Sequence, residues 1–456
     1  MIIPFADTAY SRPSYGLPAA RVVNYFPEKA FGSESVRLPR PGLSDAAPSY
    51  TVGAGPVRGI YSKPGVFDGD KFTVSGTALY RETALIGAVA GEGIVSFAAS
   101  ASQLVVVSGG TAYVYDGSSF NAISDPDLPA VAGVVTLAGR FIYTTVSSDR
   151  YYWSAVNDAA DIDGLDFATA EGSPDATVAV AVLGDELFFF GSDSTEIWFP
   201  TGDLDAPFQR TQGRRYTRGC AAAASVVQMD NTLIWVGDDR IVYRAESVPR
   251  AIGDAGISET LRDSANLAQA TAFWLPYDQH AYYVLNIPGE KTYVLDVTTA
   301  RWAEWSSFQR TTLRVQCATI DDGQAFLGDD ETGRVWLLSA DAFSDGENPI
   351  TGLLTAIRPQ SSGVARNFVV VLECTRGVGN ADSPDPVVEL RWSDDNGRTF
   401  GAWRSATLGK VGEYANKPIW RRLGSVKSPG RIYEVRITDP VMRAVRHLVS
   451  DEQRVA

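Results

Sequence analysis

Carboxylates dominate the side chains of this chain that could do chemistry. Of its 456 residues, 54 are Asp or Glu, 40 are Lys or Arg, and two are His. Hydrolysis of a glycosidic bond needs two carboxylates at a set separation, and Asp185, Glu186, Glu196 and Asp296 lie near aromatic residues. Each falls in or beside a predicted hairpin, where acidic side chains are usually solvated. We therefore expect no catalytic residues among them.

The remaining reactive side chains are scattered. His280 and His447 are far apart, and Cys220, Cys317 and Cys374 form no C-x-x-C pair. Two His and three isolated Cys do not make a zinc site, and an odd number of Cys argues against a disulfide framework. The chain has no Gly-x-Ser-x-Gly elbow, phosphate loop or dinucleotide fingerprint. We expect three reduced thiols, no metal and no cofactor.

The sharpest local motif is a turn in the C-terminal part. It reads Ser393-Asp394-Asp395-Asn396-Gly397-Arg398-Thr399-Phe400. The Ser and Asp side chains can accept hydrogen bonds from turn amides, and Gly397 can take a positive φ. The motif resembles the "Asp box" of sialidases, where it lies away from the catalytic centre. We interpret Ser393, Asp395, Gly397, Thr399 and Phe400 as a structural turn, with the aromatic ring anchoring the hairpin to the core.

Two groups of arginines are candidates for binding. Arg210, Arg214, Arg215 and Arg218 surround Tyr216, and the pair Arg421 and Arg422 lies in the C-terminal part. Such groups can contact DNA phosphates or an acidic subunit surface. The alternative is a solvated loop, which is the commoner fate of clustered charges.

Short strands joined by tight Gly/Asp turns recur between residues 57 and 345, which is typical of hairpins. The paired strands are predicted at residues 103–108 and 111–115, 140–146 and 151–155, 186–190 and 195–199, 232–236 and 240–244, 281–287 and 291–297, and 323–327 and 334–338. They repeat every 37 to 49 residues, close to the period of four-stranded propeller blades. With a weaker unit at 57–80, the pattern predicts an all-β chain with a β-propeller of six or seven blades. A long β-sandwich is the alternative, and residues 257–272 are the best helix candidate.

Composition divides the chain into three parts. The first fifty residues are rich in proline, which is excluded from central strands, so we expect an extended arm over residues 1–50. The propeller is predicted over 51–348 and a β-sandwich-like region over 349–456. From residue 355 onward there are 16 basic and 11 acidic residues, whereas the remainder has 24 basic and 43 acidic. A charge of +5 beside one of −19 supports a boundary near residue 350.

The bulk composition is that of a globular protein. Hydrophobic residues make up 45% and charged residues 21%, and the net charge is −14. This acidity argues against a protein that grips nucleic acid by its phosphates. No apolar run reaches the length of a membrane helix, and the N-terminus does not resemble a secretory signal. We expect synthesis and folding in a cytoplasm.

The C-terminal part resembles a family of podovirus (short-tailed phage) virion proteins, the tail-nozzle or packaged-DNA-stabilisation proteins. The resemblance is dense over residues 385–441 and is carried by residues 391–400, Trp403-Arg404, 408–414, 420–424 and 431–441. The start is similar too, in Asn24-Tyr25-Phe26-Pro27 and Leu38-Pro39-Arg40-Pro41-Gly42.

This resemblance implies a non-enzymatic structural subunit of the virion tail, synthesised in the cytoplasm of the host bacterium. Members are expected to form a ring, usually of six copies, that continues the DNA channel below the portal and adaptor and retains the packaged genome. The implied partners are further copies of the chain, adaptor and portal proteins, tail fibre or spike proteins, and the passing double-stranded DNA. The alternative function is a sialidase-like or carbohydrate-binding tail propeller acting on host glycans.

Overall fold

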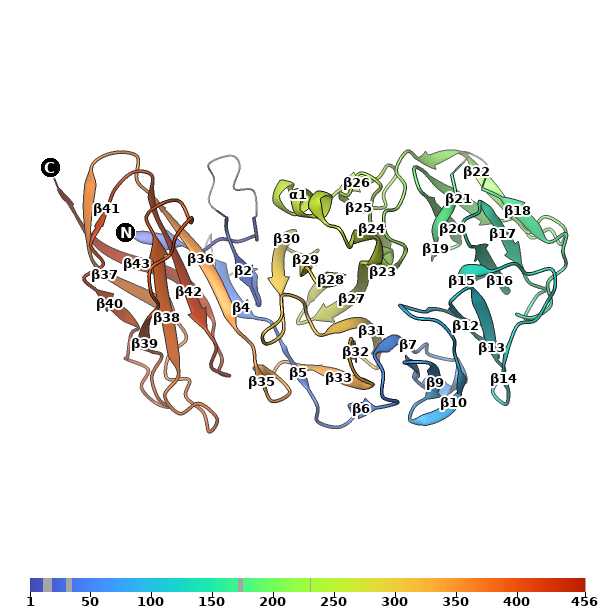
Figure 1. The fold of residues 1–456 in the computed structure, drawn as a ribbon, viewed down its shortest axis with the longest axis horizontal. Coiled ribbons are helices and arrows are strands. Elements are labelled where there is room, and N and C mark those ends of the chain that lie inside the picture. The colour runs from blue at the N-terminus through green and yellow to red at the C-terminus, as the bar shows by residue number, and fades with distance from the viewer. Residues whose placement is uncertain (11–18, 30–34, 171–174, 230, 456) are drawn as a thin grey trace.

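The computed structural model describes residues 1–10, 19–29, 35–170, 175–229 and 231–455, and the regular secondary structure of these residues is almost entirely β-strand. Figure 1 shows a ring of small sheets at one end of the molecule and two packed sheets at the other. The predicted all-β class, with a β-propeller and a C-terminal β-sandwich, is confirmed.

The ring contains seven blades within the described residues, and in the first six the four strands of each antiparallel blade follow the order of the chain. Blade 1 consists of β7 (Val57–Tyr61), β8 (Phe72–Ser75), β9 (Ala78–Arg81) and β10 (Ala84–Ala88). Blade 2 consists of β11 (Ser96–Ala99), β12 (Leu104–Ser108), β13 (Thr111–Tyr115) and β14 (Phe120–Ala122). Blade 3 consists of β15 (Val131–Leu137), β16 (Arg140–Thr145), β17 (Arg150–Trp153) and β18 (Phe167–Thr169). Blade 4 consists of β19 (Thr177–Leu183), β20 (Glu186–Gly191), β21 (Thr195–Pro200) and β22 (Phe208–Tyr216). Blade 5 consists of β23 (Val227–Met229), β24 (Thr232–Val236), β25 (Val242–Arg244) and β26 (Arg250–Ala251). Blade 6 consists of β27 (Thr271–Tyr277), β28 (His280–Ile287), β29 (Lys291–Asp296) and β30 (Arg301–Trp305).

Blade 7 closes the ring with strands from both ends of the propeller. It comprises β31 (Val315–Asp321), β32 (Gln324–Asp329) and β33 (Arg334–Ser339), and β33 pairs with β5 (Gly42–Ser44) and β6 (Tyr50–Thr51). The short strands β34 (Ser344–Asp345) and β35 (Asn348–Pro349) extend this sheet. The six predicted hairpins are the second and third strands of blades 2 to 7. Apolar clusters fill the spaces between neighbouring blades, as a propeller requires.

The C-terminal part is a sandwich of two sheets. One sheet has the order β3 (Tyr25–Lys29), β4 (Ser35–Pro39), β43 (Val445–Val455), β37 (Val364–Cys374) and β40 (Ile419–Arg421), with β1 (Ile2–Pro4) on β43 and β41 (Ser425–Val426) on β37. The other comprises β36 (Gly352–Pro359), β42 (Gly430–Ile437), β38 (Val387–Ser393) and β39 (Arg404–Thr407). Their inner faces share one apolar core with blades 6 and 7.

One sheet runs without a break from the propeller into the sandwich. The strand β2 (Val22–Val23) pairs with β30 of blade 6 on one edge and with β36 on the other. A nine-stranded sheet results, from β27 to β39. The two domains are therefore joined by backbone hydrogen bonds as well as by the linker near residue 350.

The expected extended arm over residues 1–50 is wrong for the described residues of that segment. They form β1 to β5 and part of β6, which pair with strands of this same chain, so the propeller also begins before residue 51. Residues 11–18 and 30–34 of the predicted arm lie outside the described residues. Pro27 is accommodated because β3 is an edge strand, where a missing N–H is tolerated. The boundary at 348/349 stays a prediction.

The predicted helix over 257–272 is shorter and begins earlier. The α-helix α1 spans Ala255–Asp263, and the side chain of its N-cap, Asp254, accepts a hydrogen bond from the Ile257 amide. Residues from Thr271 onward are drawn into β27 because they pair with β28. Tertiary pairing thus overrides local propensity. The part of the chain that the structure describes also has short 3₁₀ turns at Phe67–Gly69, Ala223–Ser225 and Leu267–Gln269.

Candidate functional site

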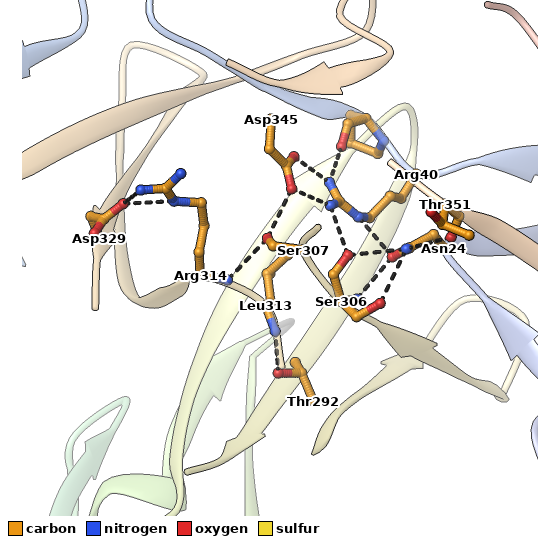
Figure 2. Close-up of polar contacts among 11 residues, drawn as sticks. Asn24, Arg40, Thr292, Ser306, Ser307, Leu313, Arg314, Asp329, Asp345 and Thr351 are labelled. Atoms are coloured by element: carbon orange, nitrogen blue, oxygen red, sulfur yellow. Dashed lines mark hydrogen bonds and ion pairs between the residues drawn. The ribbon is translucent and has the colours of Figure 1, made fainter. Parts of the chain in front are cut away.

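A buried polar network lies where the propeller meets the sandwich (Figure 2). The Arg40 guanidinium donates to both carboxylate oxygens of Asp345, at 2.9 and 2.6 Å, and both side chains are only 1% exposed. Arg40 also donates through Nε to Asn24 Oδ1 at 2.9 Å. Bidentate pairing of this kind fixes geometry as well as charge.

The same network holds three segments together. The Asn24 side-chain amide donates to the Ser306 carbonyl at 3.0 Å and to the Thr351 carbonyl at 2.9 Å. Ser307 Oγ donates to Asp345 at 2.8 Å. The N-terminal segment, the chain after blade 6 and the linker to the sandwich are therefore joined at one point. Every polar group named here has a partner, so the network positions the domains and offers no reactive group.

Asp329, drawn beside this network in Figure 2, is a second buried carboxylate that is fully engaged. Burial alone would raise its pKa, but hydrogen bonds from Trp336 and from the amides of Glu331 and Thr332, together with the Arg314 charge, lower the pKa below its ordinary value. A carboxyl group held ionised by so many donors is neither a general acid nor a free ligand.

His280 is the best-placed candidate for acid–base chemistry, and its surroundings argue against that role. Its Nδ1 lies 2.8 Å from Asp296 and its Nε2 lies 2.7 Å from Glu28. Burial lowers the His280 pKa, but the two carboxylates outweigh burial and raise it. Both ring nitrogens face carboxylates, so the imidazole is a clasp between β3 and blade 6 with no nitrogen left for a substrate.

The central cavity of the propeller does not resemble a catalytic mouth. Its volume is about 430 Å³, and its walls are mostly small, uncharged residues of the innermost strands and adjoining loops, such as Ala132, Gly133, Ala179 and Ala223. The acidic candidates lie elsewhere. Glu186 pairs with Arg214, Glu196 is buried and accepts from the Trp198 indole at 3.1 Å, Asp296 holds His280, and Asp185 is exposed in the β19–β20 turn.

The Asp-box-like turn satisfies its own polar groups. Ser393 Oγ donates to Asp395 at 2.6 Å and accepts from the Gly397 amide at 2.9 Å, and Asp395 accepts from the Thr399 amide at 2.9 Å. Gly397 has φ +86°. Hydrogen bonds from Ser393 and Thr399 lower the pKa of the Asp395 carboxyl.

Phe400 departs from the expected anchoring to the core. It is half-buried and stacks on the Arg391 guanidinium at 4.5 Å, on the outer face of the β38 sheet. Trp403 covers both Arg391 and Arg436, at 4.4 and 4.2 Å. Cation–π contacts replace core packing at this hairpin.

The structure separates the two predicted arginine groups. Arg210, Arg214 and Arg215 lie on β22, the outermost strand of blade 4, far from the central cavity. Arg210 lies 3.6 Å from Glu196, and Arg218 lies 3.4 Å from Asp239 of the next blade. Arg421 and Arg422 are exposed in the sandwich, at the opposite end of the molecule (Figure 1).

The described residues offer little else for chemistry. They contain no group of three or more His, Cys, Asp or Glu side chains placed to hold a metal ion. Within the same ranges, no helix is long and apolar enough to cross a membrane. The three cysteines are free, and burial raises the pKa of Cys220 to about 11, which keeps the thiol protonated.

Sequence reasoning missed the network of Asn24, Arg40 and Asp345 and the clasp of Glu28 and His280. Arg40 lies 305 residues from Asp345, Asn24 lies 327 residues from Thr351, and Glu28 lies 252 residues from His280. Local spacing carries no signal of such contacts. The only available sign was that Asn24 and Arg40 lie in the two N-terminal segments that carry the family resemblance.

Comparison with known proteins identifies both domains. The chain matches the family descriptions "Bacteriophage P22 Gp10, beta-propeller" over residues 27–342 and "Bacteriophage P22 Gp10, beta-sandwich" over residues 353–449. It is 22% identical over 382 residues to the tail hub protein gp10 of Salmonella phage P22, covering 78% of this chain and 80% of that protein.

Two solved structures are similar at a TM-score of 0.39 and 13% identity. The computationally designed Ika8 protein covers 74% of this chain and 98% of its own. PorZ, a surface component of the type-IX secretion system of Porphyromonas gingivalis, covers 70% and 44%. Because the family matches span both the propeller and the sandwich, the chain belongs to the bacteriophage P22 Gp10 family of short-tailed phage tail proteins.

Proposed function

We propose that this chain is the ring-forming hub or nozzle subunit that continues the DNA channel below the portal and adaptor and retains the packaged genome. The observation that carries the proposal is the family match over both domains, residues 27–342 and 353–449. The relative in Salmonella phage P22 is named a tail hub protein. A hub must hold several neighbours in fixed orientation, which demands a rigid subunit.

The join between the domains supports such a role. The nine-stranded sheet from β27 to β39 continues through the domain boundary. The buried Arg40–Asp345 pair lies at the same junction. Backbone pairing, a shared apolar core and a bidentate ion pair together oppose hinge motion between propeller and sandwich, because each would have to be broken.

The DNA channel is proposed to lie between subunits of the ring. The cavity in the propeller ring has a volume of about 430 Å³, which is the size of a small-molecule pocket. The residues before 355 carry a charge of −19. Acidic walls repel phosphates, so DNA can slide along them without being held.

The arginine groups and the further partners complete this proposal. Arg210, Arg214, Arg215 and Arg218 on the propeller rim, and Arg421 and Arg422 on the sandwich, are proposed contacts to neighbouring subunits or to passing DNA. The adaptor and portal, the tail fibre or spike proteins, and further copies of this chain in a six-fold ring are the proposed partners. The Asp-box-like residues are proposed to serve only the local fold.

A non-enzymatic role is part of the proposal. The carboxylates considered for glycan hydrolysis, other than exposed Asp185, are tied to Arg214, Trp198 and His280. The family is a structural one. No observation favours the sialidase-like or carbohydrate-binding alternative.

The proposal is tested on phage particles from which the gene for this chain has been removed. We expect particles that package DNA and then lose it, measured as genome that becomes accessible to added nuclease. Supplying the chain in trans restores retention. Mutant particles that keep nuclease-resistant DNA and infect normally, or a cryo-EM map that places the chain away from the tail axis, would contradict the proposal.

A further inference from the structure

The β43 sheet lies in the sandwich, at the opposite end of the molecule from the propeller (Figure 1). Its outer face has an apolar stripe. Ile2, Val449, Val371 and Ile419 lie directly opposite one another on four adjacent strands, β1, β43, β37 and β40. The neighbouring row, which includes Ile3, Leu448 and Leu372, is fully buried and points to the core. The stripe therefore points outward, because successive residues of a strand face opposite sides.

Arginines border this stripe. Arg366 is exposed on β37, and Arg421 and Arg422 are exposed on or beside β40. Phe368, in a bulge of β37, is 45% exposed between them. Acidic residues are fewer on this face. Glu373 pairs with Lys417 at 2.8 Å, and Asp451 is exposed. We call this surface the sandwich end face; it is apolar at its centre and basic at its rim.

The opposite end of the molecule has a surface of complementary character. The loop of residues 154–166 joins β17 to β18, and the loop of residues 201–207 joins β21 to β22. Buried Arg140 holds the two loops together, donating to the Ser154 carbonyl at 2.7 Å and the Leu204 carbonyl at 3.4 Å. Leu165 and Leu204 are 83% and 75% exposed on them.

These loops are rich in acid and contain no lysine or arginine. Their acidic residues are Asp158, Asp161, Asp163, Asp166, Asp203 and Asp205. All but Asp166 are exposed. We call this surface the propeller end face; it presents large apolar side chains within an acidic rim. Exposed apolar groups with a polar border are typical of protein interaction sites.

We propose that the sandwich end face of one copy binds the propeller end face of a second copy of this chain. This inference rests on the proposed ring-forming function and names its interface. Leu165 and Leu204 cover the apolar stripe, and Arg421 and Arg422 face the aspartates of the two loops. The charges of the two faces are opposite, and complementary charges set the register of an interface.

Because the two faces lie at opposite ends of one rigid molecule, the contact is head-to-tail. A head-to-tail contact uses two different surfaces, and it produces a closed ring when its rotation closes and an open filament when it does not. A symmetric dimer through either face alone is disfavoured, because it would set arginines against arginines or aspartates against aspartates.

Paired charge reversals on the full-length chain test this arrangement. The variant R421E/R422E reverses the rim of the sandwich end face, and D161K/D205K reverses the rim of the propeller end face. All four side chains are exposed, so both variants should fold like the wild type, which circular dichroism and thermal unfolding check. Self-association is measured by sedimentation velocity over a concentration series.

We expect each variant alone to need at least about tenfold more protein for half-assembly, because like charges then face each other. An equimolar mixture should assemble again to within about threefold of the wild type. In the mixture, the glutamates introduced in R421E/R422E meet the lysines introduced in D161K/D205K, while the second contact remains the native one. Only a head-to-tail interface between these two faces restores both contacts.

Two further variants complete the test. R398E/K410E makes the same charge change at exposed positions in the β38–β39 loop and in the loop from β39 to β40, outside the proposed interface, and should leave assembly unchanged. L165S/L204S removes the exposed apolar side chains and should weaken assembly like the charge reversals. A wild-type chain that stays monomeric, single variants that assemble normally, or a mixture that is not rescued would each overturn the proposed interface.

The proposed function can fail separately from this interface. If R421E/R422E particles still contain the chain at the tail axis, detected by cryo-EM, and still retain their DNA, then the interface is wrong and the hub function stands. If the wild-type chain assembles as expected but is located away from the tail axis, the hub function is wrong and the interface stands.

Discussion

The Arg40–Asp345 pair offers the clearest test of how the two domains are held together. Replacing Asp345 with Asn preserves the shape of the side chain and removes its charge. The Arg40 guanidinium, 1% exposed, would then be buried without a counter-charge. It would keep its bonds to Asn24 Oδ1 and to the Pro41 and Ser306 carbonyls, and the one amide oxygen left at position 345 can accept only one of the two bonds that the carboxylate accepts. Replacing Arg40 with Met leaves the Asp345 carboxylate with Ser307 as its hydrogen-bond donor.

We expect each single replacement to lower the free energy of unfolding by about 3–5 kcal/mol, the cost of leaving one charge of a buried pair uncompensated. The double variant R40M/D345L removes both charges. It should lose less than the sum of the single variants, because no orphan charge remains. The exposed pair Arg250–Glu246, at 3.7 Å with side chains 70% and 41% exposed, is the control; the variant R250M should lose less than about 1 kcal/mol.

Chemical denaturation monitored by tryptophan fluorescence measures these changes, and hydrogen exchange localises them. The exchange of β2 amides should increase in D345N, because β2 lies between the domains that the pair joins. If D345N and R40M each lose no more stability than R250M, then the pair does not hold the junction, and the rigidity argued for the hub has another source.

Three further outcomes follow from the same contacts. The free energy of unfolding should fall as pH rises from about 6.5 through the folded-state pKa of His280, which is raised. The reason is that the charged imidazole between Glu28 and Asp296 stabilises the fold below that pH range. Denaturation at a series of pH values should show this fall in the wild type and no such fall in H280Q. Deleting residues 1–51 removes β5 and β6 and exposes the edge of β33, so we expect aggregated protein, measured by size-exclusion chromatography; soluble monomer with a normal melting temperature would contradict the role of these strands. S393A should cost about 1 kcal/mol by removing the hydrogen bonds of its hydroxyl to Asp395 and Gly397, with local proteolysis of the turn increased, and a melting curve identical to the wild type would refute this.

The blades were predictable because their signals are local. Each predicted hairpin combines a tight turn with two strands of β-branched or aromatic residues, and both are fixed by neighbouring residues. The turn Gly109-Gly110 between β12 and β13, with both glycines at positive φ, is an example. Strand pairing within a blade connects residues that are close in the chain, so a reading of the sequence recovers it.

The N-terminal segment was not predictable in the same way. Val22 pairs with Leu354 and Leu43 pairs with Leu338, about 300 residues away. Proline suggested an irregular arm, yet Pro27 and Pro39 lie in a hairpin at the edge of a sheet. The choice between an arm and an inserted strand depends on which distant edge is open, and the sequence of the segment itself does not contain that information.

The fold of this chain resembles that of glycan-processing enzymes, whereas the contacts of its carboxylate side chains indicate a structural role. A propeller and an Asp-box-like turn are shared with glycan-processing enzymes, but a fold does not determine a function. Here Glu196 is committed to Trp198, Asp296 to His280, and Asp395 to its own turn. A catalytic carboxylate must reach a substrate, whereas these carboxylates hold protein segments in place. The same commitment that prevents catalysis makes the chain a stiff structural part, and stiffness is what a head-to-tail ring requires, because small angular errors at each contact add up around the ring.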